Sequence, residues 1–118
     1  MEGMEKFCIG QDYTIREAIE RIDGSKNRAA IVLNTEQGVV GIVSQGDIIR
    51  ALLSGKSLYA RINTMLRPDF YYLNDRDLPR AYHLFKKIKI TLLPVVDERF
   101  RLKSIITMDD IYQYLEEI

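Results

Sequence analysis

The sequence has few of the residues that redox, metal or nucleophilic chemistry requires. Its 118 residues include one cysteine and one histidine, and they include no tryptophan. A lone cysteine cannot form an internal disulfide bond, and one cysteine with one histidine cannot build a thiolate–imidazole zinc site. A chain without disulfide pairing is typical of reducing compartments, so we expect a cytoplasmic protein that is not itself an enzyme.

The chain also lacks an excess of charge of one sign and a long apolar segment. Its 17 basic residues balance its 17 acidic residues, so no overall field draws the protein to nucleic acid or to an anionic membrane. No apolar run approaches the roughly 18 residues needed to cross a bilayer. The polar start, Met1 to Lys6, is unlike a signal peptide. We therefore expect no nucleic-acid partner and no membrane association.

The first half of the chain has a recognisable order of secondary-structure patterns. Apolar residues at helical spacing predict helices at about 15–22 and 48–53. Buried-strand patterns occupy 29–33 and 39–43, separated by a turn, and a short apolar piece at 7–9 precedes them all. This half is therefore predicted to be β-α-β-β-α.

The same order returns in the second half at a constant offset of 63 residues, without insertion or deletion. An ungapped match of every element indicates a tandem duplication. Since each half is too small to bury a proper core, we expect two repeats, 1–60 and 61–118, that pack together as one unit. The elements expected in the second half are strands at 70–73, 92–96 and 102–106, and helices at about 78–85 and 111–115.

The stretch from Gly38 to Arg50 runs from a strand straight into a helix, with Ser44 and Asp47 at the junction. One interpretation is that they are only an N-cap and a first-turn acid. The other is that hydroxyl and carboxylate face one bound molecule at the positive helix end. The second half repeats the pair as Thr107 and Asp110. A cap alone gives no reason to keep the acid, and a carboxylate can accept two hydrogen bonds from a ribose diol, so the repetition favours a ligand.

These residues resemble CBS domains (cystathionine-β-synthase domains), and the two halves together resemble a Bateman module. The likeness rests on Gly-x-hydrophobic-Ser/Thr-x-x-Asp-Ile before the last helix, on Leu93-Pro94-Val95-Val96-Asp97 and on the order of elements. It implies an α/β (α+β) fold in which two β-α-β-β-α repeats pack through their sheets with pseudo-two-fold symmetry. It also implies a regulatory module that forms homodimers and controls an attached or partner effector protein.

The resemblance further implies an adenosine-containing ligand in clefts between the repeats, such as AMP, ADP, ATP or S-adenosylmethionine. Asp47 and Asp110 would hold the ribose hydroxyls, with Ser44 and Thr107 near ribose or phosphate. The positions before the first helix and at the start of the next strand of each repeat would flank the base; they are Tyr13, Arg76, Ala29 and Leu92.

Many nucleotide-binding CBS pairs carry a basic residue just before the Leu-Pro-Val strand, and this residue binds the phosphates. The sequence departs from that pattern in one repeat. Repeat one has Arg28 at this position, whereas repeat two has Thr91. We therefore expect a phosphate-bearing ligand in the cleft that Arg28 reaches, and an empty cleft or a less charged ligand in the other. Further basic candidates, which are more often solvated surface residues, are Arg50, Lys56 and Lys103.

Other functions find less support in the sequence. A hydrolase nucleophile at Ser44 lacks the Gly-x-Ser-x-Gly spacing because Ile42 stands two residues before it, and His83 lies among apolar and aromatic residues of a predicted helix.

The serious alternative is a ligand-free structural or dimerisation module of a larger enzyme. The segment Gly46 to Gly55 resembles CBS pairs placed ahead of sugar-phosphate nucleotidyltransferase domains. The paired Ser/Thr-x-x-Asp argues for ligand sensing, because assembly alone does not require it.

Overall fold

The first repeat forms a three-stranded sheet with two helices. The computed structural model describes residues 3–117, and none of the helices in that range is both long and apolar enough to span a membrane. The strand order is β1-β2-β3, with β1 parallel and β3 antiparallel to β2. The predicted β-α-β-β-α order is confirmed for this repeat. Its elements are a short 3-10 helix η1 (Glu5–Phe7), β1 (Cys8–Gly10), α1 (Ile15–Asp23), β2 (Ala29–Leu33), β3 (Val39–Ser44) and α2 (Gln45–Leu53).

The second repeat follows the same plan but has a two-stranded sheet, β4-β5. The strand expected at 70–73 is wrong, because only Leu73 forms an isolated parallel bridge, to Val95. Extending that ladder toward residue 71 would need an N–H donor at Pro94, and proline has none. A connector, residues 54–77, joins α2 to α3 and contains a short 3-10 helix η2 (Ile62–Thr64). The elements that follow it are α3 (Leu78–Lys87), β4 (Leu92–Val96), β5 (Leu102–Thr107) and α4 (Met108–Glu116).

The helix starts carry the caps that the sequence encodes. Thr14 accepts a hydrogen bond from the backbone N–H of Glu17 while Glu17 accepts from the backbone N–H of Thr14, so the predicted capping box is formed. The helix α1 is amphipathic and buries Ile15, Ala18 and Ile22 against the sheet. The regular apolar spacing therefore fixes which face of the helix turns inward.

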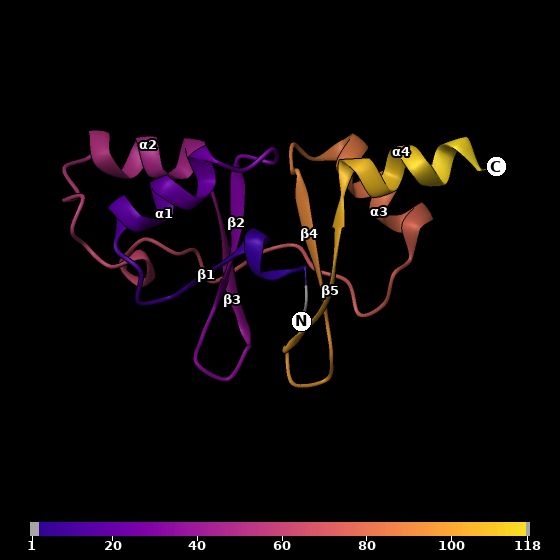
Figure 1. The fold of residues 1–118 in the computed structure, drawn as a ribbon, viewed down its shortest axis with the longest axis horizontal. Coiled ribbons are helices and arrows are strands. Elements are labelled where there is room, and N and C mark those ends of the chain that lie inside the picture. The colour runs from indigo at the N-terminus through magenta and orange to yellow at the C-terminus, as the bar shows by residue number, and fades with distance from the viewer. Residues whose placement is uncertain (1–2, 118) are drawn as a thin grey trace.

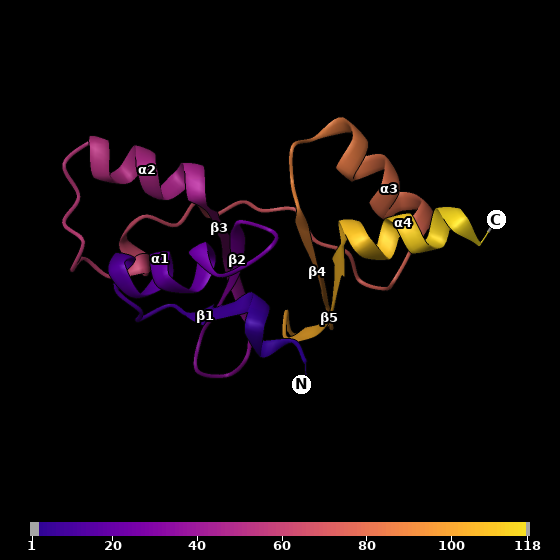
Figure 2. The same ribbon diagram turned by 45° about the horizontal axis from the view of Figure 1, so that its top comes forward.

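The two sheets meet in the middle of the molecule, and the helices lie at its two ends. Figure 1 shows β2 and β3 next to β4 and β5, with α1 and α2 beyond one pair and α3 and α4 beyond the other. The turned view in Figure 2 keeps this separation. One buried apolar cluster spans both repeats; its members are Cys8, Ala29, Ile31, Leu33 and Val39 from the first and Leu92, Val96, Leu102 and Ile105 from the second.

The two β-hairpins are joined to each other at their turns. Gly38 and Arg101 form an isolated antiparallel bridge, and the N–H of Val39 donates to the carbonyl oxygen of Phe100 at 2.8 Å. Gln37 and Phe100, which are 63 positions apart, both have left-handed backbones, with φ of 67° and 61°. The turns of the two repeats therefore have matching geometry, as expected for a duplication.

Replacing Ile31 with alanine tests whether the shared cluster holds the repeats together. Ile31 is fully buried in that cluster, so the variant should lose about 3 kcal/mol of unfolding free energy in urea denaturation. Tyr59→Ala is the control, because Tyr59 is 70% exposed and its loss should change the free energy by less than about 0.5 kcal/mol. Two separate unfolding transitions in the wild-type protein would contradict a core shared by both repeats.

Candidate functional site

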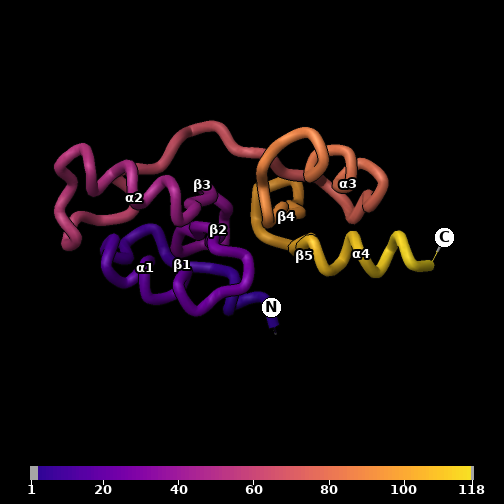
Figure 3. The backbone as a smooth tube through the Cα atoms, turned by 90° about the horizontal axis from the view of Figure 1, so that it is seen from above, coloured from indigo at the N-terminus to yellow at the C-terminus, as the bar shows by residue number. Residues whose placement is uncertain are grey.

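Two clefts lie between the repeats, on opposite sides of the central strands. Cleft 1, about 820 Å³, takes residues from the start of α2, from the connector and from the segment 88–92. Cleft 2, about 780 Å³, takes residues from η1, α1, the segment 24–27 and the start of α4. Figure 3 shows the connector on one side of the strands and the N-terminal segment on the other. The internal repeat therefore builds two related clefts.

Cleft 1 brings together five of the nine predicted binding residues. Ser44 and Asp47 come from the junction of β3 and α2, and Ala29 and Leu92 open β2 and β4. Ala29 and Leu92 are almost fully buried, so they form the floor of the cleft and expose little side-chain surface to a ligand. The fifth residue is Arg28, which immediately precedes Ala29.

Ser44 and Asp47 form a complete capping box at the start of α2. The Ser44 hydroxyl oxygen accepts from the N–H of Asp47 at 3.1 Å, and Asp47 Oδ2 accepts from the N–H of Ser44 at 2.9 Å. The argument that a cap gives no reason to keep the acid is therefore wrong, because this acid is the other half of the cap. The repeated hydroxyl and acid are explained by helix capping, and ligand binding needs further support.

The other oxygen of Asp47 is held by arginine. Arg50 Nη2 lies 2.6 Å from Asp47 Oδ1, and Arg67 Nη2 lies 3.9 Å from the same atom. Partial burial raises the pKa of Asp47, but the hydrogen bonds from Ser44 and the Arg50 guanidinium outweigh it and hold this pKa below the ordinary value of an aspartate. Asp47 is therefore ionised at neutral pH, with both oxygens engaged.

Arg28 is held in an uncommon backbone conformation at the edge of cleft 1. Its φ is 54°, a left-handed value that a non-glycine residue adopts at some cost. Its N–H donates to Ser25 Oγ at 3.0 Å, its carbonyl oxygen accepts from the N–H of Gln45, and its guanidinium donates to Gln45 Oε1 at 3.1 Å. These bonds hold the arginine against the start of α2.

The lining of cleft 1 is positively charged. Four basic side chains face two acidic ones, Asp47 and Asp69, which leaves an excess of two positive charges. An anionic ligand would gain from this excess, and more so where the cleft walls exclude water. The basic residues are Arg28, Arg50, Arg67 and Lys89.

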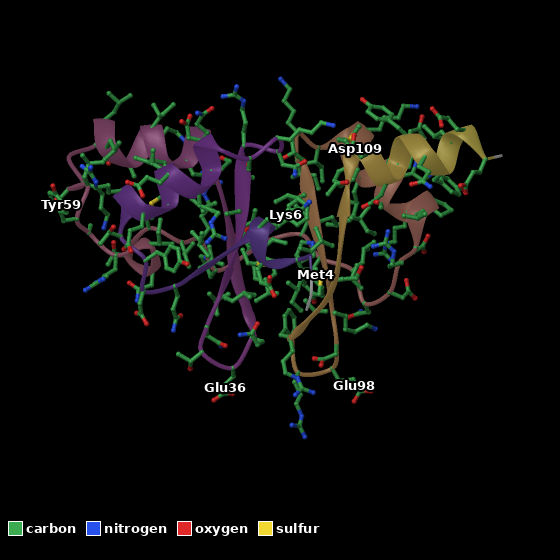
Figure 4. The ribbon with its side chains drawn as sticks, in the orientation of Figure 1. Met4, Lys6, Glu36, Tyr59, Glu98 and Asp109 are labelled. Carbon is green, nitrogen blue, oxygen red and sulfur yellow. The ribbon has the colours of Figure 1, made fainter. Side chains whose placement is uncertain are left out.

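Cleft 2 contains only Tyr13 and Thr107 of the predicted residues, and its charges balance. Three basic and three acidic side chains line it. Lys6 and Asp109, labelled in Figure 4, reach this cleft from the first and the second repeat. Lys26 Nζ lies 2.8 Å from Asp109 Oδ2, so an ion pair joins the repeats here.

The remaining predicted residues, Arg76 and Asp110, are outside the lining of both clefts. Asp110 Oδ2 accepts from the N–H of Thr107 at 2.8 Å and thus caps α4. Arg76 Nη1 donates to Ser104 Oγ at 2.6 Å and to the carbonyl oxygen of Ile105 at 2.8 Å, and its Nη2 lies 3.8 Å from Asp110 Oδ2. Arg76 is thus tied to β5 rather than directed into a cleft.

Sequence reasoning missed several residues of cleft 1, among them Arg67 and Asp69 in the connector and Lys89 after α3. The connector residues follow no repeated motif. Lys89 could have been found, because it is the counterpart of Lys26 in the repeat. Of the further basic candidates, Arg50 lines cleft 1, and Lys103 donates to the carbonyl oxygen of Asn74.

The one cysteine and the one histidine of the chain, Cys8 and His83, lie outside the lining of both clefts. Cys8 belongs to the core shared by the repeats, where burial raises the pKa of its thiol to about 11. At neutral pH it is therefore an unreactive thiol. His83 lies exposed on α3 beside Tyr82, with ring centroids 5.9 Å apart.

Two curated relatives cover most of this chain. An uncharacterized protein of Helicobacter pylori J99 is 29% identical over 110 residues, which are 92% of this chain and 32% of that protein. The arabinose 5-phosphate isomerase GutQ of Escherichia coli K12 is 32% identical over 83 residues, which are 70% of this chain and 26% of GutQ. The chain therefore spans about a third or less of these relatives. The link to nucleotidyltransferases stays a prediction.

Solved structures of CBS pairs share the fold, and a family model matches both repeats. The CBS domains of a transcriptional regulator from Streptococcus pneumoniae superpose with a TM-score of 0.76 at 16% identity, covering 92% of this chain and 89% of theirs. A CBS domain pair/ACT domain protein from Thermotoga maritima gives 0.75 at 25% identity, covering 97% and 96%. The model described as CBS domain matches residues 4–54 and 62–117. The chain belongs to the CBS domain family, as a tandem pair.

Proposed function

We propose that this CBS pair is a regulatory module that binds an adenosine nucleotide, AMP, ADP or ATP, in cleft 1 and controls an attached or partner protein. The observation that carries the proposal is the composition of cleft 1. A carboxylate, a hydroxyl, partly exposed apolar side chains and an excess of two positive charges meet there between the repeats. These groups match the ribose, the base and the phosphates of a nucleotide.

The pairing of Asp47 with Arg50 favours a ligand that carries phosphate. A ribose diol that binds Asp47 Oδ1 competes for that oxygen with the Arg50 guanidinium, whose Nη2 lies 2.6 Å away. A neutral nucleoside that displaced this guanidinium would leave it without its anion, at a cost of at most about 1 kcal/mol because the arginine side chain is 64% exposed. A phosphate group in the same cleft gives Arg50 a new anionic partner. The ribose can then bind Asp47 while the phosphate binds Arg50.

The base would lie on the apolar part of cleft 1. The accessible apolar side chains there are Tyr71, which is half exposed, and the partly buried Ile42 and Phe70, above the floor formed by Ala29 and Leu92. An aromatic ring beside apolar surface provides a stacking platform for a purine. Tyr71 would replace Tyr13 in the expected role, because Tyr13 lines cleft 2.

Cleft 2 suits a ligand with little net charge, because its acidic and basic side chains balance. S-adenosylmethionine, which has no phosphate and carries a single net positive charge, is the least charged adenosyl compound among the expected ligands. We regard it as the second choice for the protein, since the cross-repeat pair of Lys26 and Asp109 already occupies this region.

Regulation would follow from the position of cleft 1 between the repeats. A ligand that contacts α2, the connector and the segment 88–92 contacts both halves of the molecule, so its binding can change how they pack. It can shift that equilibrium only by the difference between its affinities for the two arrangements. The attached or partner protein would respond to this change.

A ligand-free dimerisation module is the alternative, and one feature favours dimer formation. The last helices of the repeats expose large apolar side chains at matched positions, since Ile49 and Tyr112 are 51% and 56% exposed. Leu53 on α2 and Leu115 on α4 extend these surfaces. A homodimer that covers them is compatible with ligand binding, because these residues line neither cleft.

Thermal unfolding with AMP, ADP, ATP, NADH, S-adenosylmethionine and adenosine tests the proposal. A ligand at about 100 times its Kd adds about 2.7 kcal/mol to the unfolding free energy if it binds only the folded state. For a domain of this size, that should raise the midpoint by roughly 10 °C. We expect the shift with a phosphate-bearing nucleotide, and a smaller one with adenosine.

Matched substitutions assign the cleft in the same assay. Asp47→Asn keeps an oxygen that can accept the Ser44 N–H but removes the charge, so it should abolish most of the shift. Asp110→Asn makes the same change at the start of α4, outside cleft 1, and should leave the shift intact. No shift with any nucleotide at millimolar concentration would favour the structural alternative.

The pH dependence of binding separates phosphate from carboxylate. The pKa of Asp47 is held below the ordinary value of an aspartate, so this group stays ionised throughout the range from about pH 7.5 to about pH 5.5. The second ionisation of a phosphate lies near pH 6, so AMP affinity should fall about two- to fourfold over that range, while adenosine affinity stays constant. Isothermal titration at both pH values measures this. A fall in adenosine affinity of the same size would contradict the assignment.

A further inference from the structure

The internal symmetry places a glycine and an aspartate at matched points of the two clefts. Gly46, in the first turn of α2, lines cleft 1, and Asp109, in the first turn of α4, lines cleft 2. We propose that this position determines which cleft accepts a phosphate-bearing ligand. The inference rests on the proposed function and adds the residue pair, Gly46 and Asp109, that makes the protein bind such a ligand on one side only.

In cleft 2, the aspartate holds a lysine of the opposite repeat. Lys26 Nζ lies 2.8 Å from Asp109 Oδ2 and 3.1 Å from Asp109 Oδ1, so both carboxylate oxygens contact the ammonium group. Asp109 belongs to the second repeat and Lys26 to the first. The carboxylate thus takes the place beside Lys26 that a phosphate oxygen would otherwise occupy.

In cleft 1, the matched lysine is free of such a partner. Lys89 is the counterpart of Lys26, and it lines cleft 1 with Gly46. Within residues 3–117, no carboxylate forms an ion pair with Lys89. The lysine therefore contributes its full charge to the excess of two positive charges in this cleft.

Another unequal pair of positions, Arg28 and Thr91, acts in the same direction but by a different route, whereas Asp69 in cleft 1 and its counterpart Lys6 in cleft 2 act in the opposite direction. Arg28 adds a cation to cleft 1, whereas Thr91 Oγ1 donates to the carbonyl oxygen of Asn27 at 2.7 Å. The effect of Gly46 and Asp109 must therefore be measured with Arg28 and Thr91 unchanged.

Gly46 can be replaced without rebuilding the backbone. Its φ is not in the left-handed region, and a Cβ there would lie 3.4 Å from Arg50 Nη1 and 3.8 Å from Ser44 Oγ, which are ordinary contacts. Gly46→Asp and Gly46→Ala should therefore both fold. The alanine variant adds the same Cβ without the charge, and it serves as the matched control.

The experiment is an NMR titration of the protein with inorganic triphosphate and, in parallel, with ATP. The amide of Tyr71 reports on cleft 1 and the amide of Glu20 reports on cleft 2, because each residue lines one cleft only. In the wild-type protein we expect triphosphate to shift the Tyr71 signal and not the Glu20 signal.

The variants should move or remove this response. Gly46→Asp should weaken triphosphate binding in cleft 1 by about tenfold at low salt, because the new carboxylate repels the anion and pairs with Lys89. Gly46→Ala should stay within about twofold of the wild type. Asp109→Gly should free Lys26 and add a response at Glu20, and Asp109→Asn, which keeps the side-chain shape, should do the same.

The two anions separate this inference from the proposed function. If triphosphate follows the expected pattern while ATP does not bind, the nucleotide proposal fails and the role of Gly46 and Asp109 stands. If ATP binds equally well to Gly46→Asp and Gly46→Ala, the role of this position is overturned and the nucleotide proposal stands. The inference is also overturned if both Asp109 variants leave the Glu20 signal unmoved, or if the wild-type protein binds neither anion.

Discussion

The apolar contact between the two sheets is the interaction on which the rest of the structure depends. A single buried cluster takes residues from β2 and β3 and from β4 and β5, and each repeat alone would expose its part of that cluster. Both clefts take residues from both repeats, so they exist only while the sheets stay packed. Binding of a ligand between the repeats is therefore energetically coupled to the packing of the core that joins them.

The duplication gives the two repeats closely similar backbone arrangements, but the side chains that line the two clefts differ. The turns at Gln37 and Phe100 and the caps at Ser44 and Thr107 keep the same geometry in both repeats. Charges at matched positions do not follow this symmetry, so cleft 1 carries an excess of two positive charges while cleft 2 carries none. Because the backbone arrangements match, any difference in ligand preference between the clefts would come from these side chains.

Periodicity and repetition were enough to predict the elements, the duplication and the packing of the repeats, because apolar burial depends on spacing that the sequence displays. The strand at 70–73 was predicted wrongly, since a single missing N–H at Pro94 ends the ladder. The role of Arg67 could not be predicted, because it lies in a connector whose path depends on tertiary packing. Five predicted residues meet in cleft 1, but Arg76 does not, because it finds acceptors on β5.

Asp47 shows why a motif of this kind is ambiguous from sequence and what the geometry adds. One oxygen, Oδ2, completes the cap of α2, and this use alone would explain the acid. The other oxygen, Oδ1, faces two arginines in a positively charged cleft, and helix capping does not require that arrangement. The cap holds the carboxylate in place, so its second oxygen is presented at a fixed point between the repeats. A residue that stabilises the helix can therefore also position the ligand, and the two roles do not compete for the same atom.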